Sequence, residues 1–295
     1  KPLLWLLALC LAVYICICSY MFAQQRQMIF PGGGTQVAAQ STDFSLQRAD
    51  VLLRGWQLHP ADGKARNAVI YFGGNAENIA HRRQQLSRSL PHSDIYMLAY
   101  RGYGASEGEP TQELLELDAA ALFDEVRRLH PQLPITVIGR SLGTGVAAAV
   151  ADLRQPEQLV LVTPFDSILN TVRGMYGWLP VELLLRDPFD SAAHLRNYQG
   201  PILVLRAGRD QVVLPERTDA LLQKGGTSIW AALLYFGIVL LLSSLVGALM
   251  GIGLILLRNH HQNKPIPFGP YLAIAGWIAL LWGDTITRWY LTTFL

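Results

Sequence analysis

Two patterns of hydrophobic residues divide this chain. Residues 1–22 and 229–295 are largely apolar, whereas residues 23–223 alternate short apolar runs with polar segments. Long apolar runs predict membrane helices, and the alternation predicts a folded domain exposed to water. We therefore expect four parts: an N-terminal transmembrane anchor at 1–22, a folded domain at 23–223, a junction at 224–228 and a transmembrane tail at 229–295.

The first apolar run covers residues 3–22 and contains no charged side chain. About 20 such residues suffice for a helix to cross a hydrocarbon core about 30 Å thick. A cleaved signal peptide is the competing interpretation, but the run is long for one and no small-residue cleavage site follows it cleanly. We predict an uncleaved anchor. The bulky residues that precede Cys10, Cys16 and Cys18 argue against lipidation.

The tail contains a second uncharged run at 229–257, long enough to cross the membrane with some tilt. A third, weaker span is predicted from Tyr271 onward. The loop between these spans carries Arg258 and Lys264, which favour a cytoplasmic position by the positive-inside rule. Alternating spans then place the domain at 23–223 on the periplasmic side of a bacterial inner membrane.

Within residues 23–223, strand-like and helix-like patterns follow one another. Runs rich in Val, Ile, Leu and Tyr predict strands at 51–58, 68–72, 95–99, 135–139, 158–162 and 202–206. Residues 111–129 predict an amphipathic helix, because Leu115, Leu122 and Val126 recur at helical spacing. This order of elements predicts an α/β fold: a mostly parallel sheet with helices on both faces.

Composition and charge narrow the classes of function. Charged residues make up 16% of the chain, hydrophobic residues 51%, and the mean hydropathy is +0.25, which excludes a disordered chain. Residues 23–223 hold 19 Lys and Arg against 21 Asp and Glu, so no basic field for nucleic acid exists there. All three cysteines lie in the first apolar run, so neither a disulfide framework nor a cysteine zinc site is expected. No cofactor or metal is predicted.

The strongest chemical signal is Gly139-Arg140-Ser141-Leu142-Gly143, between the predicted strand at 135–139 and an Ala-rich helix at 146–153. A tight turn from strand to helix needs small residues two positions either side of the serine, and it presents the hydroxyl at the edge of the sheet. A Gly-rich turn with a capping serine is the alternative. The strand and helix around the motif favour Ser141 as a nucleophile.

An acyl-transfer serine needs two backbone donors for the developing oxyanion. Leu142, directly after the serine, supplies the first. Gly73 and Gly74 follow the strand at 68–72 and let the backbone approach a ligand, so the amide of Asn75 is the expected second donor. Asn75 as a plain helix N-cap is the alternative interpretation.

Two carboxylates could orient a catalytic base. Asp210 lies on a turn just past the strand at 202–206 and is our preferred acid. Asp166, after the strand at 158–162, is the rival. A solvated loop acid is the alternative for each.

Taken together, these motifs resemble the α/β-hydrolase superfamily, and most closely its membrane-anchored serine-hydrolase-like members. The shared stretches are 71–78, 99–108, 139–143, 163–165 and 208–210, and the resemblance covers about residues 3–223. It implies an esterase or acyl-hydrolase acting on a small acyl or ester substrate, with Ser141 as nucleophile, Asp210 as acid, and Asn75 and Leu142 as oxyanion donors.

The family also supplies a histidine base, on a turn after a further strand that follows the acid. Here the first histidines after Asp210 are His260 and His261, beyond a predicted membrane span. The resemblance therefore implies a hydrolase fold truncated at its last strand, with 202–206 at the edge of the sheet, and its activity is in doubt. The segment 167–195 expected over the site is marked mainly by apolar Met175, Tyr176, Trp178 and Leu179.

The tail resembles a different family. Residues 241–248 and 264–273, with the run Pro267-Phe268-Gly269-Pro270-Tyr271, are similar to the C-terminal end of type IV prepilin peptidases, and the match covers about 229–295. The aspartate motifs that this family uses to cleave leader peptides are absent. Two truncated families joined near Lys224 indicate a native fusion, an engineered chimera or a misjoined reading frame.

The leading hypothesis is thus a membrane-anchored serine-hydrolase-like protein whose partners are a small substrate and the lipid bilayer. A fragment related to prepilin peptidase, and a noncatalytic membrane scaffold with a decayed hydrolase domain, are the alternatives.

Overall fold

The computed structural model describes residues 2–205 and 215–224, all within one compact unit, Lys1–Ser228. Asp210, residues 225–228 of the expected junction and both C-terminal spans lie outside the described residues, so those predictions stay predictions. Everything below concerns the described part of the chain.

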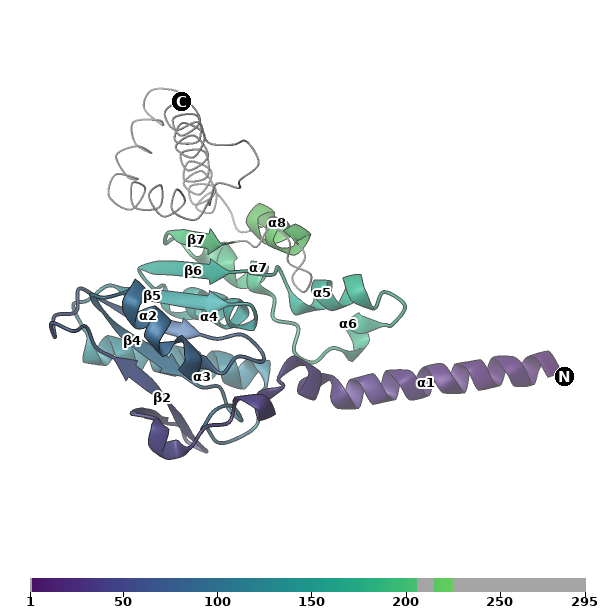
Figure 1. Cartoon of the computed structure of the whole chain (residues 1–295). Helices are drawn as coiled ribbons and strands as arrows, with labels where there is room; N and C mark the ends of the chain where they lie inside the picture. Colours follow the sequence, from purple (N-terminus) through teal and green to yellow (C-terminus); the bar gives the residue numbers. More distant parts are fainter. Residues whose placement is uncertain (1, 206–214, 225–295) are drawn as a thin grey trace, which may run out of the picture. The chain divides into compact units, whose positions relative to one another are not determined.

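A seven-stranded sheet forms the centre of the domain (Figure 1). Its strand order is β1-β2-β4-β3-β5-β6-β7. Only the pairs β1–β2 and β2–β4 are antiparallel, and every pair from β4 to β7 is parallel. The strands are β1 (Phe44–Gln47), β2 (Leu52–Leu58), β3 (Asn67–Phe72), β4 (Ser93–Leu98), β5 (Ile135–Arg140), β6 (Gln158–Val162) and β7 (Ile202–Leu205).

The mostly parallel sheet confirms the predicted fold class. Six of the strands coincide with the predicted apolar runs to within two residues at each described end. Buried parallel strands read as continuous apolar runs, which is why β3, β5 and β6 were visible in the sequence. β1 was not predicted, because its four residues alternate between half-buried and exposed side chains and carry no apolar run.

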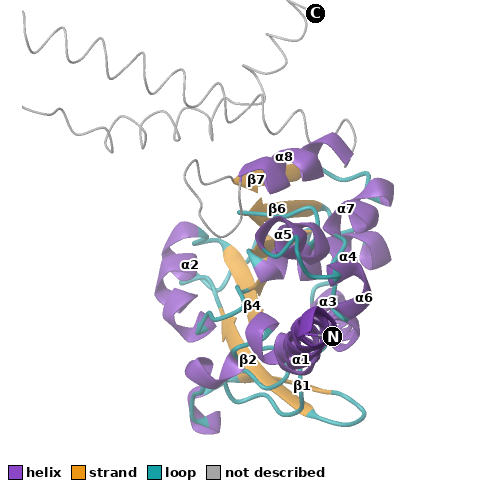
Figure 2. Cartoon of the chain, turned by 90° about the vertical axis from the view of Figure 1, so that its right-hand side faces the viewer, coloured by secondary structure: helices purple, strands orange, loops and turns teal. Residues whose placement is uncertain are grey.

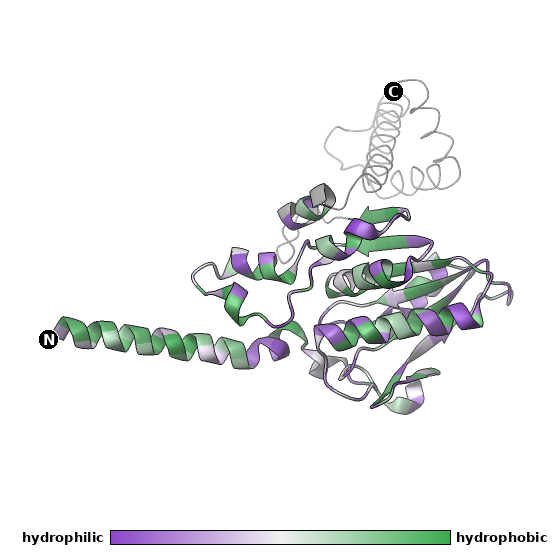
Figure 3. Ribbon diagram, turned by 180° about the vertical axis from the view of Figure 1, so that it is seen from behind, coloured by the Kyte–Doolittle hydropathy of each residue, from purple (hydrophilic) through white to green (hydrophobic). Residues whose placement is uncertain are grey.

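Helices cover both faces of the sheet (Figures 1 and 3). α2 (Arg83–Ser89) lies on one face, while α3 (Gln112–Leu129) and α4 (Leu142–Arg154) pack together on the other. Thr111 caps α3 by accepting a hydrogen bond from the Leu114 amide at 3.2 Å. The predicted helix at 111–129 is therefore confirmed, with Thr111 as its cap. The core contains Ile70, Tyr96, Val137 and Leu161, each at most 1% exposed.

Three short helices connect β6 to β7: α5 (Ile168–Met175), α6 (Val181–Leu184) and α7 (Ser191–His194). α7 packs against α4. α5 and α6 form a projecting hairpin, visible at the right of the domain in Figure 1. This connection contains the segment that the sequence placed over the site.

α1 (Pro2–Ile29) is one uninterrupted helix that leaves the sheet region (Figure 1). Its side chains from residue 2 to residue 17 are all exposed, and its most apolar window has a mean hydropathy of 2.4. Among the described residues it is the one helix long and apolar enough to cross a membrane. An exposed apolar surface of this size favours a lipid environment.

Within the described sheet, β7 lies at the end of the strand order. Leu203 is 36% exposed there, whereas Ile202 and Val204 are buried, so only part of this strand faces solvent. α8 (Pro215–Lys224) follows and is fastened to the domain: Leu221 is fully buried, and the Thr218 hydroxyl donates to the Pro164 carbonyl at 2.6 Å.

Candidate active site

Ser141 occupies a sharp turn between β5 and α4. Its backbone angles are φ 50° and ψ −117°, a region that residues with a Cβ rarely adopt. Such a conformation costs of order 1–3 kcal/mol and persists only where the surroundings enforce it. The strand-to-helix turn predicted from the sequence is therefore present, with the serine at its apex.

The two glycines of the motif are required by the close approach of backbone segments. A Cβ on Gly139 would lie 2.3 Å from the Gly143 carbonyl oxygen. A Cβ on Gly143 would lie 2.2 Å from the Phe72 oxygen and 2.7 Å from the Gly73 oxygen. Because each of these contacts is with backbone, side chains cannot move away to make room. The Gly-x-Ser-x-Gly spacing thus follows from the packing of α4 against β3.

Hydrogen bonds fix the serine backbone. The Ser141 amide donates to the Val162 carbonyl at 2.9 Å, which ties the turn to the end of β6. The Ser141 carbonyl accepts from the Thr144 amide at 2.8 Å and from the Thr144 hydroxyl at 2.6 Å. The side chain of Ser141 is left half-buried and reachable from solvent. A fixed backbone with an accessible hydroxyl suits a nucleophile.

The loop after β3 lies beside the serine. A Cβ on Gly74 would be 3.6 Å from the Ser141 Cβ, so the loop backbone borders the hydroxyl. Within the described residues, neither the Asn75 amide nor the Leu142 amide donates a hydrogen bond. Two unengaged backbone donors, one from this loop and one from the N-terminus of α4, are what an oxyanion hole requires.

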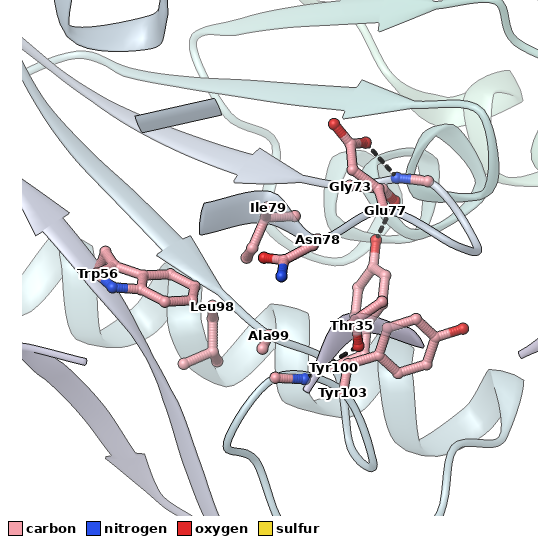
Figure 4. Close-up of a pocket in the computed structure, with 12 residues that line it drawn as sticks. Thr35, Trp56, Gly73, Glu77, Asn78, Ile79, Leu98, Ala99, Tyr100 and Tyr103 are labelled. Carbon is pink, nitrogen blue, oxygen red and sulfur yellow. Dashed lines mark hydrogen bonds between the residues drawn. The ribbon is translucent and has the colours of Figure 1, made fainter. Parts of the chain in front are cut away.

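Two tyrosines of the segment 99–108 hold this loop in place. The Tyr100 hydroxyl donates to the Gly73 carbonyl at 2.9 Å, and the Tyr103 hydroxyl donates to the Asn75 carbonyl at 2.6 Å. Burial raises the pKa of both hydroxyls above the ordinary value, so they remain protonated donors. Figure 4 shows the Tyr100 hydroxyl pointing to Gly73.

Glu77 joins the loop after β3 to the turn that carries Ser141. Its carboxylate accepts from the Gly74 amide at 2.8 Å, from Arg82 Nε at 2.6 Å and from Arg140 Nη1 at 2.9 Å. Arg140 is the residue directly before Ser141. Burial pushes the pKa of Glu77 up, but the Gly74 amide and the two guanidinium groups outweigh it, and the pKa is lowered. Glu77 therefore stays ionised and ties both sides of the site together.

Sequence reasoning did not assign a role to Glu77, Tyr100 or Tyr103. The signal for Glu77 was its position three residues after Gly74, the spacing at which a carboxylate reaches back to a backbone amide as in a capping box. The tyrosines carried no local signal. Their hydroxyls reach Gly73 and Asn75, 27 and 28 residues away in sequence.

A small pocket lies under the loop, lined on its walls by Trp56, Ile79 and Leu98 (Figure 4). Its interior of about 10 Å³ has room for about one water molecule. It is too small to hold an acyl substrate, so it belongs to the support of the loop.

Of the two candidate acids, only Asp166 lies in the described part of the chain. It is 1% exposed, its Oδ2 accepts from Asn170 Nδ2 at 2.6 Å, and its Oδ1 lies 3.7 Å from Arg217 Nη1. These contacts connect the end of β6 with α5 and α8. The preferred acid, Asp210, is outside the described residues.

No hydrogen bond joins the Ser141 hydroxyl to any of the five histidines that the structure describes. His59 pairs with Asp94, and His194 pairs with Asp152 at 3.0 Å. His130 Nε2 shares a hydrogen bond with the Tyr96 hydroxyl. His81 and His92 make no side-chain hydrogen bond. Residues 2–205 and 215–224 also contain no cluster of three or more side chains able to hold a metal ion.

Comparison with known proteins agrees with this geometry. A family model described as serine aminopeptidase, S33, matches residues 63–187, which include the loop after β3 and the serine turn. An uncharacterised protein of Mycobacterium tuberculosis is 32% identical over 208 residues, covering 67% of this chain and 74% of that protein. An α/β-hydrolase domain-containing protein of Arabidopsis thaliana is 30% identical over 194 residues, covering 59% of this chain and 63% of that protein.

Solved structures share the same fold. An α/β-hydrolase from Vibrio vulnificus has a TM-score of 0.52 at 21% identity, covering 62% of this chain and 70% of that one. The chain belongs to the α/β-hydrolase superfamily, and its domain is serine-hydrolase-like.

The chain also contains a segment related to prepilin peptidases. A prepilin leader peptidase/N-methyltransferase of Aeromonas hydrophila is 86% identical over 66 residues, which is 22% of each chain. The chain thus spans about a fifth of the length of the prepilin peptidases it matches. Together with the apolar helix α1, this relationship indicates membrane association.

Proposed function

We propose that the domain is a membrane-anchored serine hydrolase of the esterase or acyl-hydrolase class, with Ser141 as its nucleophile. The observation that carries the proposal is the strained backbone of Ser141, at φ 50°, between two glycines that allow no side chain. Strain of this kind is retained where it serves a site, and a capping serine does not need it.

In the proposed reaction, Ser141 Oγ attacks the carbonyl carbon of a small acyl or ester substrate. The resulting oxyanion accepts hydrogen bonds from the amides of Asn75 and Leu142, both unengaged among the described residues. The serine proton must pass to a base, and Asp210 is proposed to orient that base. The loop carrying Asn75 is held by Tyr100, Tyr103 and Glu77, which act as positioning residues.

The base is the open element of this proposal. General-base catalysis contributes about 10²–10⁴-fold, so a domain that lacks a base histidine would turn over slowly. A noncatalytic scaffold is the second candidate, favoured by the absence of any hydrogen bond from Ser141 to the described histidines. Processing of prepilins is the weakest candidate, because the aspartate motifs of that family are missing from this sequence.

For the location, we propose the periplasmic side of a bacterial inner membrane. The support is the charge pattern of the sequence: Arg258 and Lys264 lie in the short loop between the two C-terminal apolar runs.

A fluorophosphonate probe tests the nucleophile. We expect the full chain in detergent to be labelled on the tryptic peptide containing Ser141. Ser141→Ala should abolish labelling, and Ser45→Ala, at an exposed strand position, should not change it. Absence of labelling on the folded wild type would favour the scaffold.

The pH dependence of the labelling rate tests the base. A histidine base of ordinary pKa gives a rate that levels off above about pH 7. Without one, the rate should keep rising about tenfold per pH unit, because hydroxide must generate the alkoxide. We expect the second profile for this chain.

A further inference from the structure

The hairpin formed by α5 and α6 is fastened along one side of α1. The Tyr14 hydroxyl donates to the Trp178 carbonyl at 3.1 Å, and the two rings lie 6.4 Å apart between centroids. Nearer the domain, Gln25 Nε2 donates to the Leu184 carbonyl at 2.9 Å. Figure 2, which looks along α1, shows α6 next to it. We call residues 168–187 the cap segment.

The place where the cap segment touches α1 fixes its depth relative to the membrane. The apolar run of α1 ends at Phe22, four residues before the next charged side chain, Arg26, and Tyr14 lies eight residues before Phe22. At 1.5 Å per residue, Tyr14 lies about 12 Å inside the edge of the hydrocarbon layer, whose half-thickness is about 15 Å. The Trp178 carbonyl accepts a hydrogen bond from Tyr14. If α1 crosses the bilayer, Trp178 therefore lies below the membrane surface.

The side chains of the cap segment suit that position. Met175 is 58% exposed, Trp178 57% and Leu183 84%. Among the described residues outside α1, no other large apolar side chain exceeds 48%. Three such residues gathered on one short hairpin form an apolar surface that the domain itself does not cover.

The charged groups of the cap segment are arranged at two levels. Arg173 and Glu182 form an ion pair with each other, so the hairpin carries no unpaired charge there. Arg26 pairs with Asp187 at 3.0 Å, and the Arg186 guanidinium lies 4.0 Å from the Phe22 ring centroid. The second group lies just past the end of the apolar run of α1, at the level expected for lipid headgroups. Cations at that level suit an anionic lipid surface.

A groove between the two elements is also apolar. Ile15, Cys18, Phe22 and Leu184 line a cavity of about 360 Å³ along α1. Tyr14 and Ser19 complete its lining. A groove with these mostly apolar walls suits a lipid acyl chain.

We propose that the cap segment is a second membrane-inserting element, which dips residues 173–183 into the same leaflet that α1 enters. Its partner is the lipid bilayer. The proposal stands on the contacts with α1, and it does not depend on whether Ser141 is catalytic. It places the connection between β6 and β7, which begins beside the serine turn, against lipid.

Nitroxide labels measure the depth directly. In the full chain with Cys10, Cys16 and Cys18 replaced by Ala, single cysteines are introduced at 175, 178 and 183 and labelled. Leu11→Cys, on the exposed apolar face of α1, is the control within the bilayer, and Leu153→Cys, 48% exposed on α4, is the aqueous control. The protein is reconstituted into vesicles of phosphatidylethanolamine and phosphatidylglycerol.

We expect labels at 175, 178 and 183 to relax with dissolved oxygen more than with a water-soluble nickel chelate, as at 11, and the reverse at 153. Position 183 is the decisive one, because its side chain is 84% exposed and a label there disturbs no contact. An aqueous pattern at 183 while position 11 is in lipid would overturn the proposal. Protection from both reagents would also overturn it, because a protein surface would then cover the hairpin.

Discussion

Ser141 shows how a single backbone conformation can be forced by its neighbours. Its carbonyl is held by Thr144, its amide by the end of β6, and the chain on either side passes within contact of the β3 backbone. The hydroxyl is left half-buried at the apex. The strain at this residue is thus balanced by hydrogen bonds and packing on both sides of the turn.

Gly143 should be the least replaceable residue of the turn. We expect Gly143→Ala to lower the free energy of unfolding by about 1–3 kcal/mol, because its Cβ would meet the Phe72 and Gly73 carbonyl oxygens at 2.2 and 2.7 Å. Gly174→Ala in α5 has no atom within 4 Å of the added Cβ and should be neutral or stabilising by up to about 1 kcal/mol. Thermal unfolding in detergent, followed by near-ultraviolet circular dichroism, checks both. Equal effects at 143 and 174 would contradict the packing argument.

His194 should make stability depend on pH. The hydrogen bond with Glu116 raises the pKa of His194, burial lowers it, and the hydrogen bond with Asp152 raises it further. The resulting pKa is about 9, against an ordinary value of 6.5. The carboxylate of Asp152 is the nearer of the two, at 3.0 Å against 3.6 Å. Because the folded pKa is raised, the stabilisation is fully present below pH 6.5 and is lost as the pH rises through about 9.

We therefore expect His194→Asn to cost up to about 3 kcal/mol at pH 6 and little at pH 10. Urea unfolding of wild type and variant at both pH values measures the difference, in which other titrations cancel. His92→Asn, at an exposed turn, serves as the control. A cost for His194→Asn that is the same at both pH values would show that the ion pairs do not carry the effect.

At the scale of elements, the segment 99–108 holds the loop after β3 in place. Its two tyrosines reach Gly73 and Asn75, and Arg101 between them is 3% exposed. Arg101 Nε lies 2.6 Å from Asp118 in α3, and Nη1 lies 2.6 Å from Asp50. One buried guanidinium thus joins α3 and the turn before β2 to the segment that carries both tyrosines.

Arg101→Lys should loosen that connection. An ammonium cannot make the paired contacts of a guanidinium, and breaking a buried ion pair costs about 3–5 kcal/mol. Arg128→Lys changes an exposed pair with Glu125 on the surface of α3 and should leave the stability nearly unchanged, because solvent screens such a pair. Denaturation of both variants is the measurement. We also expect fluorophosphonate labelling of Ser141 to slow in Arg101→Lys alone, and unchanged labelling would separate the segment from the site.

For the whole molecule, the open question is how the hydrolase-like domain continues into the tail. α8 is tied to the domain through Thr218 and Leu221. After α8 the sequence passes through Gly225-Gly226-Thr227-Ser228 directly into the uncharged run at 229–257. β7 has no further strand beside it among the described residues, and an open apolar edge invites pairing with another chain.

If the chain is a composite of two truncated families, its junction should be exposed. We expect limited proteolysis of the detergent-solubilised protein to cut between 223 and 228 and to leave α8 intact. The released domain should associate through β7, and Leu203→Lys should reduce that association. A junction that resists protease would instead favour a native protein in which the tail packs on the domain, and the genomic sequence across codons 215–235 provides an independent check.

The sequence by itself determined the elements whose signals are local. The buried strands β3, β5 and β6 are continuous apolar runs, α3 has an amphipathic period, and the serine turn follows from two glycines around Ser141. The apolar run of α1 and the relationship to prepilin peptidases were also legible, because both rest on uninterrupted stretches of residues.

Only the tertiary structure decided the contacts between residues far apart in the chain. Tyr100 and Tyr103 reach the loop after β3, Glu77 reaches Arg140 across 63 residues, and Tyr14 reaches Trp178 across 164. No local pattern encodes such pairs, because each depends on how elements far apart in the sequence are arranged in space. The sequence therefore indicated Ser141 as a candidate nucleophile. The fold showed which residues hold its turn in place and that the apolar hairpin of α5 and α6 lies against α1.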